Sequence, residues 1–233
     1  MEVPPERLVS WIVAFAQRHG GAASVTHEAA GVTVTFTAAD GATAECHPPF
    51  PPLSTHLPFP LHGADSAADE VHAAAAGLAA HAAADRTVGV LLVRLGGYAA
   101  GVFAGSPPRL VSSKAGSRLV HGRSAAGGWS QHRFARRREN QAAAALRAAA
   151  DAAAEVFGPY GPSGLDAVVL GGDKRSAAGL RGDARLTPYL GYATMRFITV
   201  PDPRLAVLRD IPRAFQAIRI RLTEPESDGS PRC

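Results

Sequence analysis

In the first fifty residues, the spacing of apolar and polar side chains predicts one helix followed by short strands. Residues 5–19 carry apolar side chains at helical spacing and end at two glycines, which predicts a helix. Three stretches then alternate polar and apolar residues around Asp40-Gly41, a dipeptide that favours a tight hairpin. The pattern therefore predicts a small N-terminal unit, residues 1–47, made of a helix and a β-meander.

A proline-rich segment follows this unit. Six of the thirteen residues from Pro48 to Pro60 are proline, which is too many for a helix or a central strand. We expect residues 48–64 to form a stiff connector, although a ligand for a proline-recognition module is the alternative. Ser66 and Asp69 then resemble a capping box, which predicts that an alanine-rich helix begins there and runs to about residue 84.

The main domain is predicted to span residues 65–223. Two apolar strands, TVGVLLVRL and YAAGVFA, flank a Gly-Gly turn, and a third strand runs into a glycine-rich loop that ends at Gly128. A long helix from Ser130 to Phe157 comes next, followed by the strands DAVVLGG, MRFITV and AIRIRL with helical segments between them. This order predicts an α/β fold, a mixed β-sheet with packed helices. Residues 224–233 are expected to form a disordered tail.

Composition narrows the class of protein. Apolar residues make up 46% of the 233 residues and charged residues 19%, which is typical of a globular domain. No stretch approaches the ~18 consecutive apolar residues of a membrane span. The two cysteines, Cys46 and Cys233, are far apart and form no metal or disulfide motif. We therefore expect a cytoplasmic protein without a membrane partner.

The positive charge is concentrated in one part of the chain. Between Arg86 and Arg138 there are ten Lys or Arg residues and no Asp or Glu. The rest of the chain carries 14 basic and 20 acidic residues, a balance of −6. A block with only one sign of charge indicates a surface for a polyanion such as RNA. The alternative is a solvated face that only aids solubility.

The most unusual segment is residues 127–140, GGWSQHRFARRREN. A pair of glycines ends a loop, a helix begins at once, and four arginines occupy its first turns. Each arginine there opposes the helix dipole by typically ~0.3–1 kcal/mol, so folding alone does not favour it. Arg133, Arg136 and Arg137 are spaced three and four residues apart and share one side of the helix. Arginine offers forked donors that suit phosphate groups.

This segment resembles the catalytic middle domain of eukaryotic and archaeal class-one translation release factors. The residues that match that family's pattern are Gly127, Gly128, Ser130, Arg133, Phe134, Arg136, Arg138 and Glu139. Trp129 stands where the family has its catalytic glutamine, and a glutamine follows two residues later, at Gln131. The displaced glutamine is similar to release-factor-like peptidyl-tRNA hydrolases, and the Gly-Gly-Trp-Ser-Gln motif to their actinobacterial branch. The resemblance covers residues 86–200.

The resemblance implies a peptidyl-tRNA hydrolase that acts on stalled ribosomal complexes, with peptidyl-tRNA and the large ribosomal subunit as partners. Gln131 would position the attacking water, while Gly127 and Gly128 would allow close approach of the backbone. The reaction needs no metal and no cofactor. The residues expected to contact RNA are Lys114, Arg123, Trp129, Arg133, Arg136 and Arg137.

Two other interpretations of the protein's function are compatible with the sequence. The chain is alternatively a non-catalytic tRNA- or ribosome-binding module in which Trp129 has replaced the essential glutamine. A third possibility is a nucleotide-dependent enzyme that uses Gly171-Gly172-Asp173-Lys174, a sequence that follows a strand but lacks a full phosphate-loop motif. The histidines show no paired zinc spacing, so a metal site is not expected.

Overall fold

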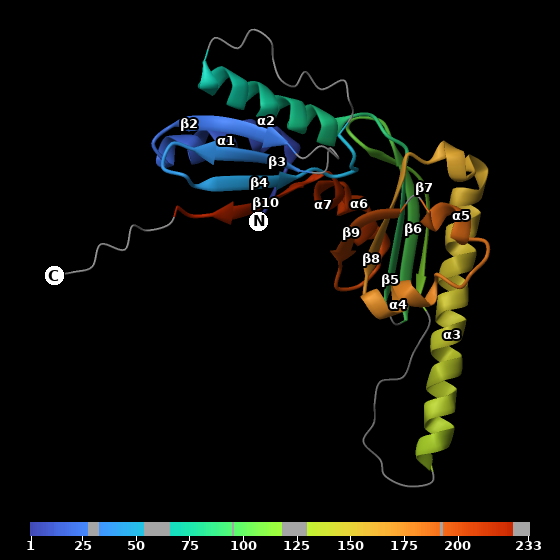
Figure 1. Cartoon of the computed structure of the whole chain (residues 1–233). Helices are drawn as coiled ribbons and strands as arrows, with labels where there is room; N and C mark the ends of the chain where they lie inside the picture. Colours follow the sequence, from blue (N-terminus) through green and yellow to red (C-terminus); the bar gives the residue numbers. More distant parts are fainter. Residues whose placement is uncertain (28–32, 54–65, 95, 118–129, 192, 226–233) are drawn as a thin grey trace, which may run out of the picture. The chain divides into compact units, whose positions relative to one another are not determined.

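The protein consists of two compact units. The computed structural model describes residues 1–27, 33–53, 66–94, 96–117, 130–191 and 193–225. One unit is formed by Met1–Ala84 together with Gln216–Cys233, and the other by Asp85–Phe215. Each unit has its own five-stranded sheet and its own hydrophobic core (Figure 1). In the described part of the chain, no helix combines the length and the apolar character needed to cross a membrane.

The first unit is an antiparallel sheet with two helices packed on one face. Its strands have the order β1-β10-β4-β3-β2, with bounds β1 (Glu2–Val3), β2 (Ala22–His27), β3 (Val34–Ala38), β4 (Thr43–His47) and β10 (Ile218–Thr223). The helices are α1 (Pro5–Arg18) and α2 (Ala67–Ala83). Apolar residues of both helices meet alternate residues of β3, β4 and β10 in one core. The other face of these strands is therefore left to polar side chains.

Local signals in the N-terminal sequence are confirmed. The helix predicted over residues 5–19 is α1, and the hairpin turn lies between β3 and β4. Gly41 has φ +90°, and the Asp40 carboxylate accepts a hydrogen bond of 2.9 Å from the Ala42 N–H. Ser66 caps α2 by accepting a hydrogen bond from the Asp69 N–H at 3.3 Å. Each of these features depends on neighbours in the sequence, so the pattern is sufficient to predict it.

The division into units differs from the one expected at residue 65. Helix α2 and strand β10, both expected in the main domain, belong to the first unit. The apolar face of α2 packs on α1, and β10 pairs with β1 and β4, where Arg221 lies opposite Glu45. The start of the expected connector also packs here, because Nε2 of His81 lies 3.0 Å from the Pro49 carbonyl oxygen. The expected connector residues 54–64 and most of the tail, residues 226–233, lie outside the described residues.

The second unit is a mixed sheet with helices on both faces, which confirms the α/β class. Its strand order is β7-β6-β5-β8-β9, with bounds β5 (Val88–Arg94), β6 (Gly97–Ala104), β7 (Arg109–Ser117), β8 (Ala167–Gly172) and β9 (Ala193–Thr199). One face is covered by α3 (Ser130–Phe157), α4 (Lys174–Gly179) and α5 (Thr187–Leu190). Two short 3-10 turns, Gly158–Tyr160 and Pro162–Gly164, follow α3.

The opposite face carries α6 (Leu205–Asp210) and α7 (Pro212–Gln216). Phe103 of β6 contacts Phe215 edge-on at a centroid distance of 5.7 Å, and Leu208 lies over Gly101. The helical segment expected between MRFITV and AIRIRL is divided into two helices, which meet at Pro212. Proline lacks the N–H that a helix interior needs, and it is accommodated at the start of α7.

Four strands of this unit end at the same edge of the sheet. Strands β5, β8 and β9 are parallel, and β7 runs in the same direction because β6 is antiparallel to both β5 and β7. The carboxyl ends of β5, β7, β8 and β9 therefore lie together. We call this the carboxyl edge. Open α/β sheets commonly bind ligands at the carboxyl ends of their strands.

One glycine at the carboxyl edge supports a specific prediction. Gly172 ends β8 with φ +108°, and an added Cβ would lie 1.8 Å from the Val93 carbonyl oxygen. We expect Gly172→Ala to lower the free energy of unfolding by about 2–3 kcal/mol, because both the backbone strain and the clash must be relieved. Urea unfolding of the two proteins measures the difference. Gly182→Ala is the control, since nothing lies within 4 Å of its Cβ position and no loss is expected.

Candidate functional site

The long helix α3 has the bounds that the sequence predicts, Ser130–Phe157. Its buried residues in the described part all lie at or after Ala145, whereas Arg136, Glu139 and Asn140 are exposed. Figure 1 shows the first half of α3 extending past the ends of the strands. The helix therefore has a C-terminal half that packs on the sheet and an N-terminal half that extends beyond it.

The predicted site residues are divided between described and undescribed parts of the chain. Gly127, Gly128, Trp129 and Arg123 lie outside the described residues, between the end of β7 and the start of α3. The backbone of α3 carries Gln131, Arg133 and Arg137 in its first turns, together with the exposed Arg136. Lys114 lies on β7.

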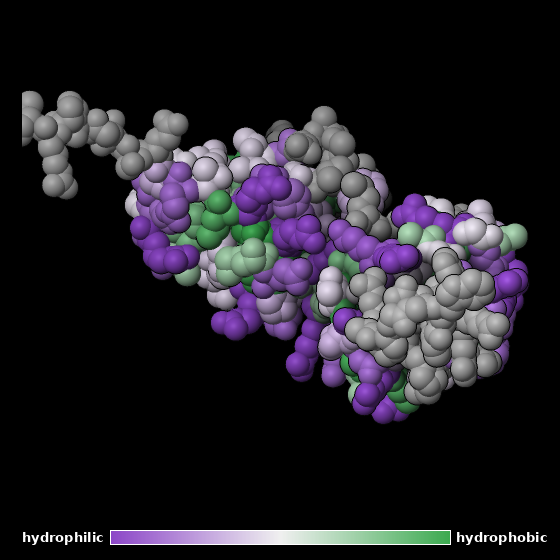
Figure 2. All heavy atoms as spheres, turned by 90° about the horizontal axis from the view of Figure 1, so that it is seen from below, coloured by the Kyte–Doolittle hydropathy of each residue, from purple (hydrophilic) through white to green (hydrophobic). Residues whose placement is uncertain are grey.

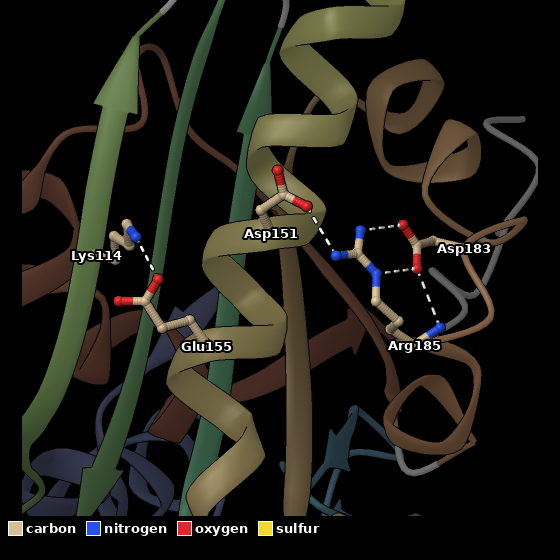
Figure 3. A network of polar contacts seen from close by, with 5 residues as sticks. All are labelled: Lys114, Asp151, Glu155, Asp183 and Arg185. Atoms are coloured by element: carbon tan, nitrogen blue, oxygen red, sulfur yellow. Dashed lines mark hydrogen bonds and ion pairs between the residues drawn. The ribbon is translucent and has the colours of Figure 1, made fainter.

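Lys114 has a partner within the protein. Its ammonium group donates a hydrogen bond to the Glu155 carboxylate of α3, and this bond raises the pKa of Lys114 (Figure 3). Both side chains are exposed. The interaction joins the edge strand β7 to the packed half of α3. Lys114 is therefore part of the support of the helix in this structure, in addition to its predicted role toward RNA.

A second polar contact holds the other side of α3. The Arg185 guanidinium donates to Asp151 of α3 at 2.7 Å and to both carboxylate oxygens of Asp183, at 3.0 and 2.7 Å. Figure 3 shows that Lys114 and Arg185 approach α3 from different elements, one from β7 and one from the segment before α5. The forked geometry fixes the direction of the arginine as well as its charge. The two contacts together restrain the packed half of α3.

The pKa of Asp183 allows a prediction about pH. The Arg185 side chain and backbone N–H hold this pKa below its ordinary value. The stability that the ionised carboxylate contributes is thus present above the ordinary pKa and is lost as the pH falls through the lowered pKa. We expect Asp183→Asn to be less stable than the parent at pH 7, with a difference that shrinks below about pH 4. Urea unfolding at both pH values tests this. Asp210→Asn, at an exposed site on α6, is the control.

The segment Gly171–Lys174 does not form a phosphate loop. Asp173 is the N-cap of α4, and its carboxylate accepts hydrogen bonds from the N–H of Ser176 at 2.8 Å and from its hydroxyl at 2.7 Å. The protein's own carboxylate thus occupies the position that an anion would take. The glycine at 172 is required by its close approach to β5. These contacts remove the basis for the nucleotide-dependent alternative.

The end of β7 borders a pocket of about 350 Å³. Ala115, Gly116 and Ser117 line one side, and the segment Asp202–Leu205 lines the other. Arg94, at the end of β5, holds the neighbouring segment through bonds to the carbonyl oxygens of Val200 at 3.3 Å and Pro201 at 2.6 Å. The structure thus builds an open, partly polar surface where β7 leads into residues 118–129.

A metal cluster and a reactive thiol can both be examined in the described residues. No group of three or more His, Cys, Asp or Glu side chains in the described ranges could hold a metal ion. Cys46 is fully buried, and burial raises the pKa of its thiol to about 12, so it does not supply a thiolate nucleophile.

The fold and the charge define a class of protein: an α/β domain with a basic helix that extends past the carboxyl edge of its sheet. Residues 86–221, 136 of the 233, match the family model described as Actinobacteria/chloroflexi VLRF1 release factor. The chain belongs to this family. This confirms the resemblance to release factors of the actinobacterial branch, and it associates the protein with translation.

Two solved structures are similar to the chain. The archaeal translation termination factor aRF1 matches with a TM-score of 0.41 and 12% identity, over 56% of this chain and 36% of its own. An archaeal protein matches with a TM-score of 0.36 and 12% identity, over 92% of this chain and 65% of its own. This chain therefore spans less than two thirds of the length of either. No curated protein sequence matches it.

Proposed function

We propose that the protein is a peptidyl-tRNA hydrolase that frees nascent peptides from tRNA on stalled complexes of the large ribosomal subunit. One observation carries the proposal. In a chain of a release-factor family, the Gly-Gly-Trp-Ser-Gln segment leads directly into the basic helix that extends past the carboxyl edge. The reaction would take place in the cytoplasm, where the ribosomes are.

The chemistry is the hydrolysis of an ester. A water oxygen attacks the carbonyl carbon that joins the peptide to the terminal ribose. The bond between this carbon and the ribose oxygen then breaks, the peptide leaves with a new carboxylate, and the ribose oxygen takes a proton. Such an ester needs a positioned water and donors for the developing oxyanion, but no metal or covalent nucleophile.

Gln131 is the residue that we assign to the water. Its amide has no useful pKa and does not act as a general base, but it can hold a water in line with the carbonyl. Ser130 begins α3 at the end of the loop, so Gln131 lies in the first turn of the helix. Gly127 and Gly128 would let the loop backbone come close to the ester.

The cations near this segment are assigned to the RNA. Arg133, Arg136 and Arg137 would bind phosphates of the tRNA end, and Arg123 would add to them from the loop. Trp129 would stack on a terminal base, a contact worth ~1–3 kcal/mol. Lys114 can serve as a further contact while it stays bonded to Glu155, because its ammonium group carries three donors and is exposed.

The test is release of labelled peptide from purified peptidyl-tRNA, free in solution and bound to isolated large subunits. The proposal expects release that is faster from the subunit-bound substrate and that depends on the amount of protein. Trp129 at the position of the family glutamine favours a second candidate, a non-catalytic binding module. Binding to the subunits without any release would support that candidate.

A further inference from the structure

A set of cations lies on and after α4, outside the segment assigned above. Lys174 and Arg175 open α4, and Arg181 follows it. All three side chains are exposed. None has an ion pair with any residue that the structure describes, unlike Lys114 and Arg185. From Asp173 to Arg185 the sequence has four cations and two carboxylates.

This segment runs beside α3. A Cβ at Gly179 would lie 2.7 Å from Cδ1 of Leu146, and Arg185 bonds to Asp151. The chain from α4 to Arg185 is thus held against α3 between residues 146 and 151. Arg147 is exposed in the same interval of α3. Figure 1 shows α4 beside the middle of α3 at the end of the sheet from which the first half of the helix extends.

The nearby carboxylates are already engaged by other groups. Asp151 and Asp183 bind Arg185, Glu155 binds Lys114, and Asp173 caps α4. These carboxylates therefore neutralise or cap other groups and do not form ion pairs with Lys174, Arg175 or Arg181. In the described part of α3 beyond Arg136, Glu139 is the one carboxylate left without such a bond. The surface keeps a positive excess as a result.

We propose that Arg136, Arg147, Lys174, Arg175 and Arg181 form a continuous strip, the α3–α4 strip, that binds the phosphate backbone of the tRNA acceptor stem. This proposal deepens the proposed function and rests on it. Strand β7 leads into the Gly-Gly-Trp-Ser-Gln loop from the same carboxyl edge at which α4 begins. A stem bound along the strip would therefore lie close to the carboxyl edge, at which β7 ends.

The dimensions and surface character of the strip fit a nucleic acid. Arg136 and Arg147 are eleven residues apart, about 16 Å along a helix axis, which is long enough to meet several successive phosphates. Figure 2 views the molecule from below, and the coloured atoms at this end of the unit are a mixture of hydrophilic and hydrophobic residues. All five cations of the strip are exposed, and a row of exposed cations suits a phosphate backbone better than the core of a protein interface, where charged residues are depleted.

The test uses an RNA hairpin with a single-stranded 3′ end as the probe, without any peptide. We expect Lys174→Ala/Arg175→Ala/Arg181→Ala to bind the hairpin at least ~10-fold more weakly at low salt. The slope of log affinity against log salt should fall by about 2, because each lost phosphate contact removes ~0.7–0.9. Far-ultraviolet circular dichroism and thermal unfolding establish that the variant is folded.

A matched control removes the same charge elsewhere in the same unit. Arg109, Arg209 and Arg213 are exposed, and none has an ion pair among the described residues. The triple alanine variant at these positions should keep most of the affinity and the salt slope. Equal losses in both variants would overturn the strip, because net charge alone would then explain binding. An unchanged affinity in the α4 variant would overturn it too.

A second experiment tests whether the strip contacts tRNA or ribosomal RNA, by measuring binding of the same variant to isolated large subunits. If the α4 variant binds the hairpin normally but loses isolated large subunits, the strip contacts ribosomal RNA and the proposal fails. Failure of the strip is separate from failure of the proposed function. The proposal of the strip is wrong if the α4 variant binds the hairpin as well as the parent does while the parent still releases peptide. The function fails if no peptide is released, whatever the hairpin affinities are.

Discussion

Replacing Gln131 by alanine is expected to lower the rate of peptide release at least ~100-fold, since it removes the group that holds the attacking water. Binding to large subunits and the unfolding temperature should stay close to those of the parent. Gln131 lies in the first turn of α3, and the buried residues of that helix in the described part begin at Ala145. Rates of release from saturated complexes measure the effect directly.

Gln141→Ala is the control for this experiment. Gln141 lies ten residues further along the same helix and is partly buried. Its replacement tests whether the loss of any glutamine from α3 lowers the rate of peptide release. We expect it to release peptide at nearly the parental rate. Unchanged release by Gln131→Ala would move the catalytic role to Trp129 or His132, or remove it from this loop.

Charge reversal at the start of α3 is expected to have the second largest effect. Arg133→Glu/Arg136→Glu/Arg137→Glu should weaken binding to tRNA at least ~100-fold at low salt and reduce the salt slope by about 2–3. Three phosphate contacts are lost together because these positions share one side of the helix. Folding should not suffer, since glutamates near a helix N-terminus are favoured by the dipole. A salt series of binding measurements gives the slope.

The control again distinguishes a specific surface from net charge. Glutamates at Arg109, Arg209 and Arg213 change the total charge by the same amount on other elements of the unit. Their effect should be small and screened by salt. A parental salt slope in the α3 variant would show that the RNA contacts lie elsewhere, and the basic block would then be only a solubilising face.

Features set by local sequence were predictable. The bounds of α3 follow from Ser130 at its start and Gly158-Pro159 at its end, and both bounds are found. The hairpin at Asp40-Gly41 and the cap at Ser66 are equally local. The family was also recognisable, because its motif lies within about fourteen consecutive residues. The mixed sheet followed from the order of the strands.

The partners of α2 and β10 were not predictable in this way. The alternation in AIRIRL fits any half-buried antiparallel strand, and it contains no information on which strand lies beside it. In the structure, Arg221 of β10 lies opposite Glu45, 176 residues away in the sequence. The apolar face of α2 likewise indicates burial but does not identify α1 as its partner.

The same limit applies to the site. The basic start of α3 is evident in the sequence, whereas Lys174 and Arg175 follow an incomplete phosphate motif that does not indicate RNA binding. The available signal was their position after β8, since the carboxyl ends of parallel strands share one edge. The contacts from Lys114 to Glu155 and from Arg185 to Asp151 join residues 41 and 34 positions apart. Such pairs become visible only when the sheet and helix are placed together.

The central claim is that water, positioned by this protein, cleaves the ester of peptidyl-tRNA. The most direct measurement is mass spectrometry of the peptide released from tRNA on isolated large subunits in water enriched in oxygen-18. The account predicts released peptide with one heavy oxygen in its new C-terminal carboxylate. Peptide that stays attached to tRNA while the protein is bound, or that is released without the heavy oxygen, would contradict it.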